Sequence, residues 1–104
     1  IMYLPKIYEK FSAKFPEVFK DFQALGKTCR ESGPLEQKYQ DLANLGIAIG
    51  TNSRGAVMSQ TRKALESGAS KEEIAHVVLL SLTTIGFPSM MAAMGWVDEV
   101  LEGS

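Results

Sequence analysis

Apolar residues recur at helical spacing along most of the chain, and glycine, proline and small polar residues separate the runs. This pattern predicts helices over residues 5–15, 16–32, 35–50, 54–67, 71–85 and 89–101. No segment alternates apolar and polar residues with the period of two that indicates a half-buried strand. The predicted fold is therefore all-α, a single-domain helical bundle of about five to six helices that spans residues 1–104.

The middle of the chain carries the clearest signals for helix ends. Asn52 or Ser53 is expected to cap the helix that follows, because their side-chain oxygens accept hydrogen bonds from first-turn N–H groups. Gly68 stands just past the end of that helix, where a left-handed residue is common. Ser70 and Glu73 are three residues apart and predict a capping box for the next helix.

The last two predicted helices, at residues 71–85 and 89–101, are apolar nearly all round, the first of them from residue 74 onward. Such helices must be buried nearly all round, and a protomer of 104 residues is too small to cover both. The surplus apolar surface predicts a homo-oligomer. A compact monomeric bundle with these two helices at its centre is the alternative.

Composition excludes several classes of function. A net charge of −1 and a pI near 5.8 argue against nucleic acid and anionic membranes as partners. No apolar run reaches the ~18 residues of a bilayer-spanning helix. Cys29 is the single cysteine, which excludes an intrachain disulfide and fits a reducing cytoplasm. One histidine without a cysteine cluster is too few metal ligands, so neither a metal nor another cofactor is expected.

Two stretches of sequence resemble a known family. They are the run RKALESGASKEEI at residues 62–74 and Gly-Phe-Pro at residues 86–88. In this arrangement residues 35–88 resemble the carboxymuconolactone decarboxylase-like family, which includes the alkylhydroperoxidase D proteins. The resemblance implies an all-helical, alkylhydroperoxidase D-like fold that assembles into trimers or hexamers.

The active positions of that family depart from this sequence. Its peroxidase branch carries Cys-x-x-Cys-x-x-x-His on one helix and a glutamate on the helix before. The resemblance puts these positions on Ser53, Ala56, Gln60 and Asp41, so both thiols and the imidazole are missing. The decarboxylase branch places a glutamate at Ala56 and a histidine at Gln60, which are also missing. Peroxide reduction by a dithiol needs an attacking and a resolving thiol, so that chemistry is not expected here.

Asp41, Ser53, Ala56 and Gln60 are therefore candidates for a pocket, without an assigned catalytic role. Asp41 either lies on a solvated polar face or contributes to the pocket. Gln60 is expected to be largely buried, and a buried amide needs hydrogen-bond partners. Those partners are either the backbone and Asn44, or a small polar ligand.

His76 and Cys29 are secondary candidates. His76 follows Glu72 and Glu73 by one helical turn and can pair with either, as a surface or interface histidine or as a general base. Cys29 has apolar neighbours such as Phe22, which favours a buried, inert thiol over a reactive one.

Two functions follow from these observations. The first is a family member without dithiol redox chemistry, whose pocket binds a small molecule or whose assembly is itself the function. The second is an active enzyme of the decarboxylase or alkylhydroperoxidase (antioxidant) type, working on a small organic acid or a peroxide.

Overall fold

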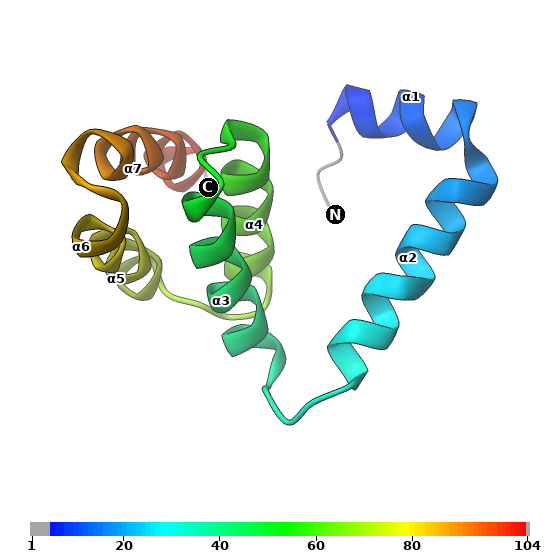
Figure 1. Ribbon diagram of the computed structural model, residues 1–104, viewed down its shortest axis with the longest axis horizontal. Helices are drawn as coiled ribbons and strands as arrows, with labels where there is room; N and C mark the ends of the chain where they lie inside the picture. Colours follow the sequence, from blue (N-terminus) through cyan, green and yellow to red (C-terminus); the bar gives the residue numbers. More distant parts are fainter. Residues whose placement is uncertain (1–4, 104) are drawn as a thin grey trace. The chain divides into compact units, whose positions relative to one another are not determined.

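The computed structural model describes residues 5–103, which form helices and no strand. The all-α prediction is therefore confirmed. Backbone contacts divide the chain into two compact units, Ile1–Leu35 and Glu36–Ser104, so the single domain over residues 1–104 stays a prediction. The first unit holds α1 (Lys6–Lys14) and α2 (Pro16–Glu31). The second holds α3 (Gln37–Gly50), α4 (Arg54–Glu66), α5 (Lys71–Leu80), α6 (Leu82–Ile85) and α7 (Phe87–Glu102) (Figure 1).

In the part that the structure describes, residues 5–35, the first unit is a pair of helices that forms no buried core. Phe15 ends α1, and Pro16 is the first residue of α2, where its missing N–H costs nothing. The ring of Phe11 packs 5.7 Å from that of Phe15 and 6.2 Å from that of Phe19, centroid to centroid. Neither helix buries a side chain completely. Among residues 5–35, the large apolar side chains that are exposed are Ile7, Tyr8, Phe11, Phe15, Val18, Phe22, Leu25 and Leu35.

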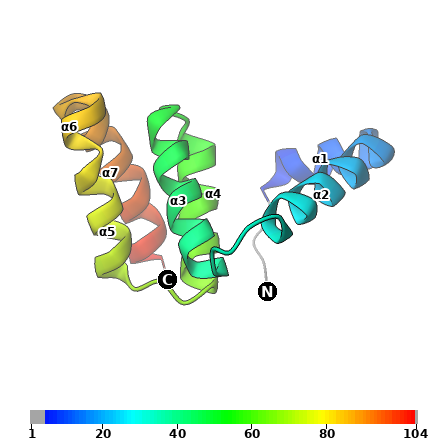
Figure 2. The same ribbon diagram turned by 60° about the horizontal axis from the view of Figure 1, so that its bottom comes forward.

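The second unit has a core to which four helices contribute. In Figure 2, α3 lies alongside α4 and α5 lies alongside α7, and α4 also packs on α7. The fully buried apolar side chains come from every one of these helices at helical spacing. They include Leu45 and Ile49 of α3, Val57 and Ala64 of α4, Ile74 and Val78 of α5, and Met90, Ala93 and Val97 of α7.

The predicted helix ends in this unit form as expected. Ser53 caps α4, and its Oγ accepts a hydrogen bond from the N–H of Ala56 at 3.4 Å. Asn52 instead takes the left-handed conformation in the turn, with φ 56°. Gly68 has φ 98° just past the end of α4, and Ser70 begins α5 with the predicted capping box.

The helix predicted over residues 71–85 divides at Ser81. The hydroxyl of Ser81 donates to the carbonyl oxygen of Val78 at 2.6 Å, and its backbone N–H bonds to the same oxygen. This i−3 pairing tightens the chain and separates α5 from α6. Gly86, with φ 90°, then ends α6, and α7 begins at Phe87 rather than at residue 89. If α5 and α6 are counted as one helix, the described residues form six helices, within the predicted five to six.

The expectation that this helix is buried nearly all round is wrong for the chain by itself. Leu79 and Leu80 of α5 are 53% and 61% exposed. Much of the exposed apolar surface lies instead on α1 and α2. The prediction of an oligomer had used only the last two helices. Exposed apolar surface, from which the sequence predicted assembly, is therefore present, but it is spread over more helices than the two expected.

Candidate functional site

Asp41 is buried within the second unit. Its side chain is 1% exposed, so the interpretation as a solvated residue is wrong. Asp41 precedes Leu45 by one turn and Ala48 by two, and all three belong to the buried stripe of α3. The helical register thus carries this carboxyl into the core although its sequence neighbours are polar.

Along α4, the three remaining pocket candidates lie in different environments. Ser53 is exposed, and its hydroxyl serves as the helix cap. Ala56 is half-buried and packs against the core. Gln60 is half-buried as a residue, but its Oε1 is enclosed and has no hydrogen-bond partner among residues 5–103. The neighbouring Thr61 differs, because its buried hydroxyl donates to the carbonyl of Val57 at 2.7 Å.

The partner expected for Gln60 does not satisfy this oxygen. Since α3 and α4 run antiparallel about the turn at Asn52, Asn44 and Gln60 lie at equal distances from that turn. Asn44 nevertheless donates no hydrogen bond to Gln60 Oε1 in the described part of the chain. An amide oxygen accepts hydrogen bonds and neither attacks a substrate nor transfers a proton at neutral pH. This position can therefore bind and orient a donor group.

A separate open hollow of about 420 Å³ lies between α3 and the α5–α6 segment. It is mostly apolar, and Ser81 and Thr84 are the hydroxyl-bearing residues of its lining. Its lining consists of Leu42, Ala43, Gly46, Gly50, Val77, Leu80, Ser81, Thr84 and Ile85, a set called the α3–α5 groove below. None of the candidate residues predicted from sequence lines it. Gly46 and Gly50, one turn apart on α3, are the sequence signal that was missed.

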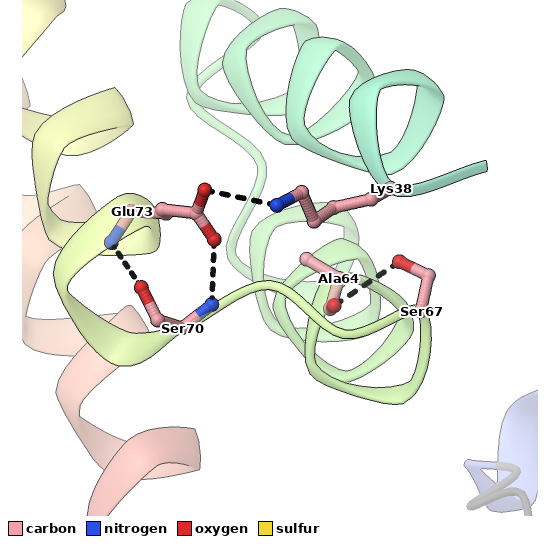
Figure 3. A network of polar contacts seen from close by, with 5 residues as sticks. All are labelled: Lys38, Ala64, Ser67, Ser70 and Glu73. Atoms are coloured by element: carbon pink, nitrogen blue, oxygen red, sulfur yellow. Dashed lines mark hydrogen bonds and ion pairs between the residues drawn. The ribbon is translucent and has the colours of Figure 1, made fainter. Parts of the chain in front are cut away.

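An ion pair ties the two sides of this unit together near the start of α3. Lys38 Nζ lies 3.1 Å from Glu73 Oε2, and Glu73 Oε1 accepts the backbone N–H of Ser70 at 2.9 Å (Figure 3). The hydrogen bond from Ser70 and then that from Lys38 lower the pKa of Glu73. The same carboxylate, through its hydrogen bond and charge, raises the pKa of Lys38. The pair links α5 to α3, and it engages both charged groups.

The secondary candidates are both exposed. His76 makes no pair with Glu72 or Glu73 in the described residues, and the carboxylate of Glu73 is engaged by Lys38 and Ser70. Cys29 is exposed on α2, so the interpretation as a buried thiol is wrong for the chain by itself. Within residues 5–103, no three His, Cys, Asp or Glu side chains gather where they could hold a metal ion.

None of the helices in the described range is both long and apolar enough to cross a membrane.

Comparison with known proteins identifies the family. Two uncharacterized proteins of Methanocaldococcus jannaschii are similar to this chain over most of their length. MJ0742 is 33% identical over 88 residues, which cover 84% of this chain and 85% of the relative. MJ1511 is 31% identical over 85 residues, which cover 82% of this chain and 79% of the relative. The model of the carboxymuconolactone decarboxylase family matches residues 16–99, from the first residue of α2 into α7. The chain therefore belongs to the carboxymuconolactone decarboxylase family.

Proposed function

We propose that this protein is a family member without dithiol redox chemistry that binds a small polar organic molecule beside α4. The observation that carries the proposal is the enclosed Oε1 of Gln60, which has no partner in the described chain. An enclosed polar atom without a hydrogen bond is costly and uncommon in folded proteins. A bound molecule that donates a hydrogen bond removes that cost.

The residues at the family's redox positions support the first half of the proposal. Ser53 and Ala56 stand where the resemblance expects the two thiols. The hydroxyl of Ser53 already caps α4, and Ala56 carries no reactive group. Cys29 lies on α2 and is the only thiol of the chain, so one protomer cannot form the disulfide of a dithiol cycle.

The chemistry of Gln60 selects the ligand class. Its oxygen accepts a hydrogen bond from an O–H or N–H group, whereas its NH₂ group donates to a carboxylate. A small organic acid with a hydroxyl group offers both partners, and an organic hydroperoxide offers the O–H donor. We therefore place small organic acids first and peroxides second.

Assembly and location are part of the same proposal. We infer a homo-oligomer, a trimer or hexamer, because large apolar side chains are exposed on both units. The lone Cys29 is consistent with a reducing cytoplasm.

A second candidate function is an enzyme of the decarboxylase or alkylhydroperoxidase type. The observation that favours it is Asp41, a carboxyl buried in α3 at the position where the resemblance expects an acid. A buried carboxyl near a bound substrate can exchange a proton with it. Turnover of a lactone acid or hydroperoxide that is lost in Asp41→Asn, while the fold is retained, would favour this candidate over simple binding.

A ligand screen tests the binding proposal. The parent, Gln60→Leu and the exposed-site control Gln37→Leu are heated with a panel of small hydroxy acids, lactone acids and hydroperoxides. At least one compound should raise the Tm of the parent and of the control but not that of Gln60→Leu. A panel that shifts none of the three, or shifts Gln60→Leu as much as the parent, removes the proposal.

A further inference from the structure

The α3–α5 groove lies on the second unit and the outer face of α2 on the first, and each is an apolar surface that its own unit leaves uncovered. On α2, Val18, Phe22, Leu25 and Cys29 follow one another at helical spacing and form one stripe, called the α2 stripe below. All four are exposed, Phe22 to 67%. We infer that the α2 stripe of a second copy of this chain seats in the α3–α5 groove. This inference rests on the homo-oligomer proposed above and names its interface.

The floor of the groove is shaped for a helix. Ala43, Gly46 and Gly50 leave little or no side chain along one face of α3, so another backbone can approach closely. A Cβ added at Gly46 would meet only Val77 Cγ1 at 3.8 Å, and one added at Gly50 would meet nothing within 4 Å. The space above the two glycines is therefore open. The remaining lining is mostly apolar and suits apolar side chains of an incoming helix.

The dimensions of the two surfaces agree. At 1.5 Å per residue, the groove follows about 12 Å of α3 from Leu42 to Gly50. By the same rise, the whole stripe from Val18 to Cys29 covers about 16 Å of α2, and its part from Val18 to Leu25 covers about 10 Å. Phe22, between them, projects the largest side chain of the stripe. Two turns of α2 therefore match the length of the groove.

The family match supports another copy of this chain as the occupant. It begins at Pro16, so α2 belongs to the family domain although the helix buries no side chain completely. An amphipathic helix of a folded domain that buries none of its side chains completely needs a cover for its apolar face. Every copy carries one stripe and one groove, so seating between copies covers both in equal number. The net charge of −1 adds little repulsion between them.

The exposed apolar area of the stripe supports association. Val18, Phe22 and Leu25 are 56%, 67% and 60% exposed, and they leave water when the stripe is seated. A stable interface buries ~800 Å² per partner, and each copy takes part twice, once through its stripe and once through its groove.

The first test compares particle size by light scattering. Gly46→Leu fills the groove, and the open space there means that the protomer can accept the side chain. Gly95→Leu is the matched control, on an exposed site of α7 with nothing within 4 Å. The parent and Gly95→Leu should form the oligomer, and Gly46→Leu should fall to the 11.4 kDa protomer with unchanged helix content. Phe22→Glu should do the same, with Lys20→Glu as its control on α2.

The outcomes separate this inference from the proposal on which it rests. A parent that stays at 11.4 kDa removes the oligomer and the interface together. A parent oligomer that survives in Gly46→Leu, to the same extent as in Gly95→Leu, overturns the interface alone.

The second test identifies the seated helix by cross-linking, and it decides the case if a variant unfolds. The parent supplies Cys29 on the stripe, and Cys29→Ser/Thr84→Cys supplies a thiol in the groove. The two proteins are unfolded together, refolded and treated with a short bis-maleimide. Mixed dimers should form in large excess over those obtained when Cys29→Ser/Glu66→Cys replaces the groove variant. Equal yields of mixed dimer from the two mixtures would overturn the inference. A variant that carries both Cys29 and Thr84→Cys gives a second check: cross-links that form only within single chains would also overturn it.

Discussion

Replacing Gln60 by leucine separates a ligand position from a structural amide. The Oε1 of Gln60 is enclosed without a partner, and such a group costs about 1–3 kcal/mol of folding free energy. Leucine has a similar size and a helix propensity close to that of glutamine, so the helix itself should be little affected. Gln60→Leu should therefore raise the free energy of unfolding by up to ~1–3 kcal/mol in the absence of ligand.

Equilibrium unfolding in urea measures this change, with both proteins at the same protomer concentration because assembly adds to apparent stability. Each 1 kcal/mol should raise the Tm by ~4–8 °C for a chain of this size. Gln37→Leu is the matched control, since Gln37 is exposed at the start of α3 and its replacement should have little effect.

A loss of stability in Gln60→Leu would refute the reasoning. It would mean that other groups depend on the amide, and that its replacement leaves them without partners. The position would then be structural, and the main support for a ligand at α4 would disappear. An unchanged midpoint together with a changed m-value would instead indicate an altered denatured state, which the control variant helps to recognise.

Three further predictions test the electrostatics, the backbone and the redox chemistry. The hydrogen bond from Ser70 and the ion pair with Lys38 lower the pKa of Glu73 from its ordinary value of 4.5, and the same ion pair raises the pKa of Lys38 from 10.5. The pair should therefore stabilise the fold at pH values between 4.5 and 10.5. The Tm advantage of the parent over Glu73→Gln should therefore shrink as the pH falls below 4.5 or the salt concentration rises, and an advantage independent of pH would contradict the assignment. Gly86 has φ 90° and ψ 165°, so Gly86→Ala should lose ~1–3 kcal/mol in urea unfolding, whereas Gly95→Ala should gain up to ~1 kcal/mol; equal effects would contradict strain at Gly86. Dithiol-driven reduction of an organic hydroperoxide should show no turnover in the parent, and turnover that disappears in Cys29→Ser would reveal a cysteine cycle between protomers or with an external thiol.

The fold could be predicted well because local chemistry sets most helix ends. Pro16 lacks the N–H that a first helical residue does not use, and Ser53 and Ser70 accept first-turn N–H groups. These effects need no knowledge of distant residues. The break at Ser81 was missed because serine is compatible with a helix interior, and the bond from its hydroxyl to Val78 leaves no mark on the apolar periodicity.

The candidate site could be predicted only in part, because burial depends on what lies against a helix face. Asp41 has polar neighbours in sequence, and the decisive signal was its spacing from Leu45 and Ala48. Cys29 lies on an apolar stripe and was expected to be buried, yet nothing in a stripe specifies the surface that covers it. The enclosure of Gln60 Oε1 was anticipated from its place on α4, whereas its lack of a partner depends on the positions of neighbouring side chains.

The two proposed surfaces use different sides of α3. Successive residues of a helix are rotated by about 100°, so adjacent positions face different neighbours. Asp41 consequently lies in the core, while Leu42 lines the groove. Leu45 and Ala48 continue the core side toward α4, which carries Gln60, and Gly46 continues the groove side toward α5. The proposed ligand binding at α4 and the proposed assembly through the groove would therefore depend on separate faces of one helix.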